Sequence, residues 1–175
     1  MSKRPLVIQR ERPDELSGLA WKWQTDKGPA GHNFTPAYDR IFGPVRMTIE
    51  RVLEIGVFMG GSLKMWHDYF PRAHVVGVDK VDYAATCPKS KWPRIDIVTG
   101  DAALPATRDA VLKLEGAKFD IIIDDGSHDP VEVAEIHANL GPLLKNGGYY
   151  VIEDIEMREK GLATAKGHSL WVSWG

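Results

Sequence analysis

Acidic side chains recur in this sequence where short apolar segments end. Each of these segments is rich in β-favouring residues, which predicts a strand. The carboxylates at or just past their ends are Glu54, Asp79, Asp101, Asp124, Asp125, Glu153 and Asp154. Parallel strands end at one edge of an open α/β sheet, and ligands bind at that edge. Turn and N-cap preferences of Asp explain one or two such positions but not the whole set, so we expect a common binding edge.

A glycine-rich turn follows the first of these segments. Residues 56–61 read GVFMGG and lead into Ser62, a residue type that caps helices. A strand that enters a helix through glycines exposes backbone N–H groups to a ligand, which is typical of nucleotide-type cofactor sites. Taken alone, the turn equally allows an ordinary βα connection that needs glycine for positive φ.

Nicotinamide dinucleotides and S-adenosylmethionine compete as the ligand of this turn. Asp79 follows it at a distance suited to binding ribose hydroxyls in either cofactor. Phe58 stands where the pattern G-x-G-x-x-G has its second glycine, and its side chain would obstruct a pyrophosphate. Glu54 would repel a pyrophosphate but suits the amino or sulfonium group of S-adenosylmethionine. The turn therefore favours a methyl-transfer cofactor.

Strands and helices that position these residues alternate along the chain. Apolar runs predict strands at residues 52–55, 74–78, 95–98, 119–123 and 149–152. Helical spacing predicts helices at residues 16–23, 36–42, 62–70, 105–114 and 130–145, the last ended by Asn146-Gly147-Gly148. This alternation predicts an α/β protein with a Rossmann-like, doubly wound, mainly parallel sheet and helices on both faces.

The composition of the 175 residues, with 43% hydrophobic and 26% charged side chains, is that of an ordinary globular protein. A net charge of −2 gives no electrostatic reason to expect nucleic acid or an anionic membrane as partner. No secretory signal or membrane-length apolar run is visible. The single cysteine, Cys87, excludes an internal disulfide and a cysteine-based zinc cluster. We therefore expect a cytoplasmic protein.

The segment before the first predicted strand holds several reactive side chains beside glycines. They are Lys27, His32 and Tyr38, in and after the loop TDKGPAGH. We expect residues 1–45 to form an N-terminal helical or lid segment with these three as substrate or lid contacts. Residues 46–175 would then form the cofactor-binding domain. A solvated surface loop is the alternative for residues 25–32.

A set of motifs spread over residues 24–155 carries a family resemblance. They are TDKG, LEIGVFMGGSLKMWHDYFP, GVDK, GDA, FDIIIDDGSH and GGYYVIEDI. The chain resembles class I S-adenosylmethionine-dependent methyltransferases, and more narrowly the magnesium-dependent macrolide-sugar O-methyltransferases of the mycinamicin and macrocin type, with their cephalosporin hydroxylase-like relatives. DDGSH followed by VIED is the most specific part. The resemblance implies an enzyme that methylates a sugar or small-molecule hydroxyl of a natural product.

The same resemblance assigns roles to individual residues. It implies an S-adenosylmethionine site formed by Glu54, Gly56, Gly60, Ser62, Asp79, Asp101, Ala102 and Asp124. It implies Mg²⁺ ligands at Asp125, Glu153 and Asp154, and catalysis by Asp125 with His128 as general base. Carboxylates without a cysteine cluster suit a hard cation, and an imidazole beside them can take the proton of an acceptor hydroxyl.

The chain departs from the family pattern after the fifth predicted strand. Residues 156–175 leave room for one short strand at most, so we expect the sheet to lack some C-terminal strands. An open edge beside the fifth strand, with an apolar tail containing Trp171 and Trp174, predicts a homo-oligomer. Two alternatives to an active methyltransferase stay open, a nicotinamide-dependent oxidoreductase and a truncated, non-catalytic S-adenosylmethionine-binding module.

Overall fold

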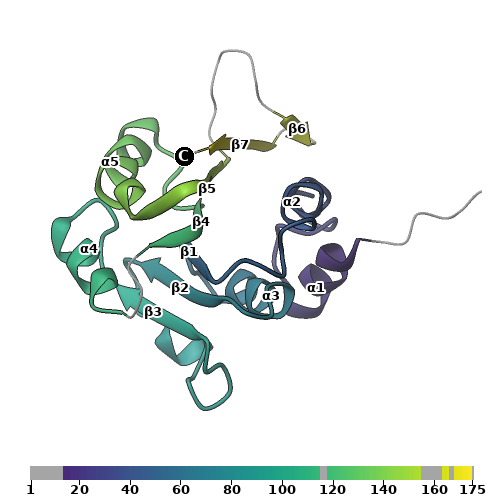
Figure 1. The fold of residues 1–175 in the computed structure, drawn as a ribbon, viewed down its shortest axis with the longest axis horizontal. Helices are drawn as coiled ribbons and strands as arrows, with labels where there is room; N and C mark the ends of the chain where they lie inside the picture. Colours follow the sequence, from purple (N-terminus) through teal and green to yellow (C-terminus); the bar gives the residue numbers. More distant parts are fainter. Residues whose placement is uncertain (1–13, 115–117, 155–162, 166–167, 175) are drawn as a thin grey trace, which may run out of the picture.

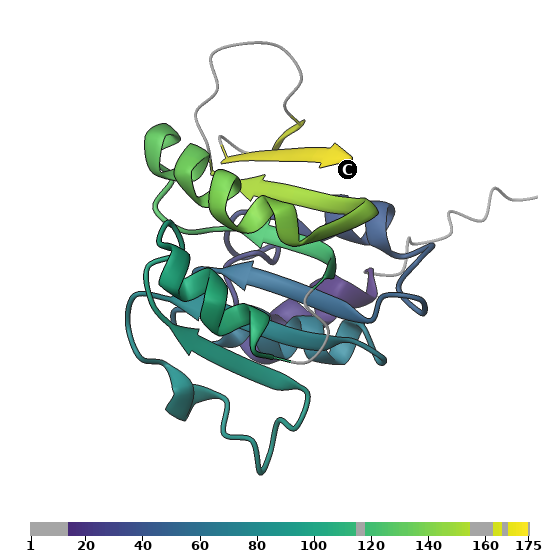
Figure 2. The same cartoon turned by 60° about the vertical axis from the view of Figure 1, so that its left-hand side comes forward.

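A seven-stranded sheet forms the centre of the protein (Figures 1 and 2). The computed structural model describes residues 14–114, 118–154, 163–165 and 168–174, the last two ranges by their backbone only. The strands are β1 (Arg51–Ile55), β2 (His74–Asp79), β3 (Ile95–Thr99), β4 (Phe119–Asp124), β5 (Leu144–Glu153), β6 (Ala163–Ala165) and β7 (His168–Trp174). Their order is β3-β2-β1-β4-β5-β7-β6, and β1 to β5 run parallel. The predicted Rossmann-like, mainly parallel sheet is confirmed.

The described helices cover both faces of the sheet (Figure 1). One face carries α1 (Glu15–Trp23), α2 (Thr35–Phe42) and α3 (Gly61–Tyr69). The other carries α4 (Pro105–Leu112) and α5 (Pro130–Leu140). Two short 3₁₀ turns are η1 (Ala84–Thr86) and η2 (Gly141–Leu143). The doubly wound arrangement expected from the alternating pattern is therefore present.

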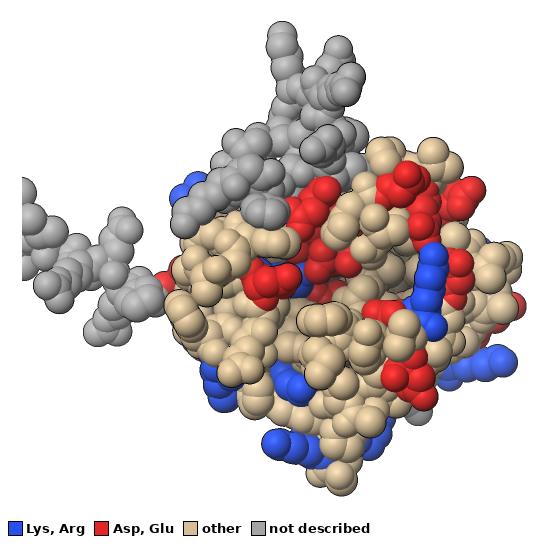
Figure 3. Space-filling model, turned by 180° about the vertical axis from the view of Figure 1, so that it is seen from behind, with Lys and Arg blue, Asp and Glu red and all other residues tan. Residues whose placement is uncertain are grey.

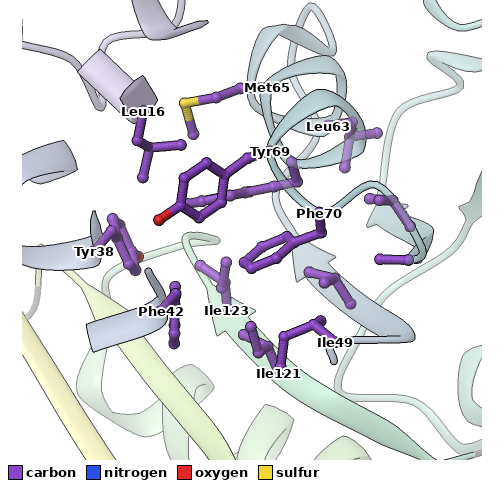
Figure 4. Packing of buried hydrophobic residues seen from close by; sticks show 14 of the residues in the cluster. Leu16, Tyr38, Phe42, Ile49, Leu63, Met65, Tyr69, Phe70, Ile121 and Ile123 are labelled. Atoms are coloured by element: carbon purple, nitrogen blue, oxygen red, sulfur yellow. The ribbon is translucent and has the colours of Figure 1, made fainter. Parts of the chain in front are cut away.

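Strand side chains alternate between two hydrophobic cores, one on each face. Ile121 and Ile123 of β4 pack on the side of α1 to α3, whereas Ile122 packs on the side of α4 and α5. Figure 4 shows Ile121 and Ile123 near Phe42, which ends α2, and Phe70, which directly follows α3. Residues 14–45 contribute to this same core, while residues 1–13 of the predicted lid segment lie outside the described residues. A lid role stays a prediction.

The chain reverses its direction of travel across the sheet at β1. β1 pairs with β2 on one side and with β4 on the other, and Ile55 lies opposite Asp124. In parallel α/β sheets such a switch point leaves a crevice at the carboxyl ends of the two strands. The glycine-rich turn after β1 and the acidic segment after β4 therefore meet at this crevice.

The expectation that the sheet lacks C-terminal strands is wrong. β7 pairs antiparallel with β5, from Tyr149 opposite Trp174 to Glu153 opposite Leu170, and β6 pairs with β7. Antiparallel neighbours need no crossover helix, so the few residues after β5 suffice for two strands. β7 covers the edge of β5 whose exposure was the main reason to expect a homo-oligomer.

Two local predictions are also corrected. The helix predicted for residues 130–145 ends at Leu140, because Pro142 cannot donate a helical hydrogen bond, and residues 144–148 belong to β5. Ser62 does not cap α3: the N-cap position is Gly60, and the Ser62 hydroxyl donates to Glu54 instead. Within the described residues, no helix has the length and apolar character needed to cross a membrane.

Candidate functional site

Three neighbouring strands end in carboxylates that surround one ammonium group. Glu54 lies in β1, Asp125 directly follows β4, and Glu153 ends β5. Lys27 Nζ lies 2.5 Å from Asp125 Oδ2 and 2.7 Å from Glu153 Oε2. It lies 3.5 Å from Glu54 Oε1. Lys27, Glu54 and Glu153 are almost fully buried, so this is an internal cluster of charges rather than a surface network.

The loop between α1 and α2 carries Lys27 into the sheet edge. The backbone N–H groups of Phe34 and Thr35 both donate to the carbonyl of Lys27, at 2.8 and 3.1 Å. Gly31 permits the tight path of this loop, because a Cβ there would lie 2.2 Å from the carbonyl oxygen of Asp26. The backbone around Lys27 is thus fixed by contacts within the loop.

Burial and neighbouring charges shift the pKa values in this cluster. Burial alone would lower the pKa of Lys27, but the surrounding carboxylates, Asp125 foremost, hold it well above its usual range. Burial, together with the charge of Asp125, raises the pKa of Glu153 above its usual value. Tyr38 of α2 donates its hydroxyl to Glu153, and burial and that carboxylate raise its pKa well above normal. Lys27 is therefore the charged donor around which the carboxylates are arranged.

A second set of groups converges on the more exposed side of this cluster. One donor atom each of Asp125, His128 and Asp154 lies within 4.8 Å of the others. His32 Nδ1 lies 2.8 Å from Asp154 Oδ2. His128 and Asp154 have φ values of +59° and +54°, a region that non-glycine residues seldom adopt and that is frequent at functional sites. We call Asp125, His128 and Asp154 the outer set.

The outer set fits a divalent cation. Its two carboxylates offer the oxygen ligands that a hard dication such as Mg²⁺ prefers, and its imidazole lies beside them. The structure brings two predicted metal ligands, Asp125 and Asp154, together with the predicted base His128. The carboxylate of the third, Glu153, is turned to Lys27 and Tyr38. The predicted set of Asp125, Glu153 and Asp154 stays a prediction.

One backbone contact determines the tautomer of His128. Its Nδ1 lies 3.2 Å from the carbonyl oxygen of Glu153, and a carbonyl can only accept a hydrogen bond. In the neutral ring Nδ1 therefore carries the proton, and Nε2 keeps its lone pair. The side chain is 40% exposed, and Nε2 lies 4.0 Å from Asp125 Oδ1. His128 can thus accept a proton from a ligand beside the carboxylates.

A cavity of about 680 Å³ joins the glycine-rich turn to these groups. In Figure 3 acidic side chains gather around a hollow on the face drawn there. The lining includes Trp23, Lys27, His32, Gly56, Phe58, Ser62, Asp79, Tyr83, Asp125, His128 and Asp154. The turn and the outer set therefore face one space, which has the size of a small-molecule site.

Asp79 supports the glycine-rich turn directly. Its Oδ2 accepts hydrogen bonds from the backbone N–H groups of Val57, at 2.8 Å, and Phe58, at 3.3 Å. Gly56 and Gly60 have φ values of +91° and +70°, which explains glycine at both positions. Phe58 itself has φ +46° and is 73% exposed, so its ring stands out from the turn.

The predicted cofactor residues fall into two groups. Gly56, Ser62 and Asp79 line the large cavity, and Gly56, Asp79 and Ala102 line an adjoining cavity of about 200 Å³. Glu54, Gly60, Asp101 and Asp124 line neither cavity.

Buried carboxylates account for two members of the second group. Glu54 accepts hydrogen bonds from Ser62 Oγ at 2.7 Å and Trp66 Nε1 at 3.1 Å. Asp124 lies beneath the turn that follows β4, and its burial raises its pKa to about 6. These two carboxylates support the site from below rather than facing the cavity.

The predicted substrate or lid residues are also divided by the fold. Lys27 and His32 line the large cavity, although Lys27 is only 1% exposed, whereas Tyr38 is fully buried behind Glu153. Trp23 and Tyr83 also line the cavity, although the sequence did not predict them as site residues. Trp23 ends α1, Tyr83 lies in the loop after β2, and neither belongs to a motif, so no sequence signal distinguished them from core or loop aromatics.

Comparisons with known proteins bear on this geometry. The mycinamicin VI 2''-O-methyltransferase of Micromonospora griseorubida is 40% identical over 151 residues, 82% of this chain and 37% of that enzyme. A rhamnosyl tetracenomycin-C 2'-O-methyltransferase of Streptomyces olivaceus is 38% identical over 148 residues, 81% of this chain and 38% of that enzyme. The solved structure of the MycE methyltransferase of mycinamycin biosynthesis, with Mg and SAH, superposes with a TM-score of 0.71 at 41% identity. It matches 82% of this chain and 40% of that one.

The chain has the class I methyltransferase fold and is homologous to these enzymes. The resemblance expected from its motifs is thereby confirmed. This methyltransferase-fold chain spans somewhat under two fifths of the length of the curated relatives just named, at 37% and 38%. No family model matches it.

Proposed function

We propose that the chain is a magnesium-dependent O-methyltransferase that uses S-adenosylmethionine to methylate a hydroxyl of a glycosylated small molecule. The observation that carries the proposal is the outer set beside the glycine-rich turn, facing one cavity. Support comes from the MycE structure, 40% identical, which holds Mg, SAH and mycinamycin VI. The curated relatives methylate mycinamicin VI and a rhamnosyl tetracenomycin-C, as their names state.

S-adenosylmethionine would supply the methyl group, and a hard dication such as Mg²⁺ would lower the pKa of the acceptor hydroxyl. Asp125 and Asp154, with Glu153 as the further predicted ligand, would hold the ion. The cofactor would be held by Gly56 of the turn, Ser62 of α3 and Asp79 at the end of β2, and Ala102 would lie at its nucleoside end. The hydrogen bond from Nδ1–H to the Glu153 carbonyl would orient the His128 ring, and Nε2 would take the proton of the acceptor hydroxyl.

The alternatives left open by the sequence gain no support. The exposed Phe58, in place of the second glycine of a dinucleotide turn, still argues against a nicotinamide cofactor. The truncated, non-catalytic module was motivated by missing strands, and β6 and β7 are present. The homo-oligomer and the cytoplasmic location stay proposals, and the oligomer has lost the open edge of β5 as its reason.

The test is a methyl-transfer assay on the purified chain. Radiolabelled S-adenosylmethionine is supplied with a panel of rhamnosylated and other deoxysugar-bearing compounds, with Mg²⁺ or with excess chelator. Label transfer that requires both the sugar hydroxyl and Mg²⁺ supports the proposal. Calorimetric binding of NAD but not of S-adenosylmethionine, or transfer unaffected by the chelator, would contradict it.

A further inference from the structure

Carboxylates outnumber cationic side chains at the carboxyl edge of the sheet, and Lys27 is the buried cation among them. Four carboxylates gather there, Glu54 and Glu153 within the protein and Asp125 and Asp154 nearer the surface. Like charges at such separations strongly disfavour one another's ionised forms. A single divalent ion in the outer set does not meet Glu54, whose carboxylate faces Ser62, Trp66 and Lys27.

Asp125 contacts both Lys27 and the outer set, using one carboxylate oxygen for each. Oδ2 lies 2.5 Å from Lys27 Nζ, and Oδ1 points to the outer set, 4.0 Å from His128 Nε2. Its side chain is 23% exposed, compared with 1% for Lys27. The orientation of the Asp125 carboxylate is therefore set from inside by the ammonium, whatever binds outside.

Neutral side chains donate further hydrogen bonds to the two buried carboxylates, Glu54 and Glu153. Tyr38 donates to Glu153, and Ser62 and Trp66 donate to Glu54. Lys27 supplies the positive charge in this arrangement, and its loop backbone is fixed by Phe34 and Thr35. Removing one partner of a buried ion pair leaves an uncompensated charge, which is strongly destabilising.

We propose that Lys27 is a positioning residue that acts as the permanent inner cation of the site. It compensates Glu54 and Glu153 and orients Asp125, so that the outer set is assembled before any metal arrives and takes one divalent ion. The inference rests on the proposed function for the outer ion only. It further requires that a divalent ion can partly replace Lys27 when the lysine is removed.

The experiment compares melting temperatures of the wild type, Lys27→Met and Lys27→Met/Glu153→Gln without metal. Lys27→Met is expected to melt about 10 °C lower. Glu153→Gln in that background removes one of the uncompensated carboxylates and is expected to restore at least half of the loss. Lys22→Met, which removes an exposed ion pair with Asp68 from the same segment, is the matched control and should shift melting by less than about 2 °C.

Magnesium is then titrated into each protein. The rise in melting temperature is expected to be larger for Lys27→Met than for the wild type by about 2 °C or more, since the ion also relieves the inner carboxylates. A merely structural lysine would lower stability without changing the response to metal.

Each failure has a distinct meaning. The role of Lys27 is overturned, even if methyl transfer is active, by either of two results. One is a melting temperature of Lys27→Met equal to that of the wild type, and the other is a melting temperature of the double variant no higher than that of Lys27→Met. If Lys27→Met cannot be purified in a folded form, we expect that Lys27→Met/Glu153→Gln can be. If the double variant is unfolded as well, charge compensation by Lys27 is wrong. No metal response in any protein refutes the outer ion of the proposed function, while the metal-free comparison still decides the role of Lys27.

Discussion

The α-carbon of Gly56 lies against the carbonyl oxygen of Asp125, so that a Cβ on Gly56 would stand 2.1 Å from that oxygen. The N–H of Asp125 in turn donates to the carbonyl of Ile55 at 2.9 Å. The turn after β1 and the segment after β4 are thus pressed together at the switch point of the sheet. Any change at Gly56 must displace Asp125, which belongs to both the inner and the outer groups of the site.

Gly56→Ala is expected to lower the free energy of unfolding by about 3 kcal/mol or more, because it adds a severe contact to an unfavourable φ of +91°. Gly147→Ala is the matched control. Gly147 also has positive φ, +77°, but no atom lies within 4 Å of its added Cβ, so only about 1 kcal/mol is expected. Urea unfolding measures both, and equal losses would show that the contact with Asp125 is unimportant.

His128→Ala is expected to reduce methyl transfer by about 10²–10⁴-fold, the usual effect of losing a general base. Binding of S-adenosylhomocysteine, measured by calorimetry, should change little because the turn is untouched. His137→Ala, on the exposed side of α5, is the control and should keep its turnover. Near-normal turnover of His128→Ala would assign the proton to another acceptor.

Asp79→Ala is expected to weaken binding of S-adenosylmethionine at least tenfold. A hydrogen bond to a charged group contributes about 1.5–3 kcal/mol, and Asp79 also holds the N–H groups of the turn. Asp82→Ala removes an exposed carboxylate from the loop that follows β2 and should leave the dissociation constant unchanged. Unaltered affinity in Asp79→Ala would remove this residue from the cofactor site.

Asp154→Asn is expected to abolish most of the rise in melting temperature that Mg²⁺ produces in the wild type. The carboxylate is one of two in the outer set, and a neutral amide is a weaker ligand for a hard cation. Asp109→Asn, which alters an exposed carboxylate on α4, controls for the change in net charge. A metal response that survives in Asp154→Asn would exclude Asp154 as a ligand.

The half-buried His67 predicts a pH dependence of stability away from the site. Burial lowers its pKa from the usual value near 6.5. Below about pH 6.5 the unfolded chain therefore binds more protons at this residue than the folded chain, and stability falls as the pH falls. The slope from this group is at most about 1.4 kcal/mol per pH unit.

His67→Phe keeps an aromatic ring against Trp92, whose centroid lies 5.0 Å from that of His67, and removes the titration. Its unfolding free energy should decline less steeply than that of the wild type between pH 6.5 and the folded-state pKa. Comparison at pH 8, where the imidazole is neutral in both states, isolates the effect of packing. Parallel curves for the two proteins would show that His67 does not contribute to the slope.

Local patterns in the sequence were sufficient to predict the first five strands and the edge of the sheet at which the site lies. Runs such as residues 121–123 are apolar on both faces, which is typical of a strand in a parallel sheet that helices cover on both sides. Once the strands are parallel, Asp125 and Glu153 must emerge at the same edge. These inferences need only the period of side chains and the direction of strands.

Tertiary structure decided which partner each of these carboxylates has. Lys27 and Glu153 are separated by 126 positions, and no periodicity links them, so their contact depends on the path of the loop between α1 and α2. The same holds for the turn of Glu153 toward Tyr38 and for the pairing of β7 with β5. Sequence periodicity shows which face of a single helix or strand is buried. Contacts between segments far apart in the sequence depend on the backbone torsions and packing of all the residues between them. For that reason the residue types of the site were predictable, and the division between an inner lysine cluster and an outer set was not.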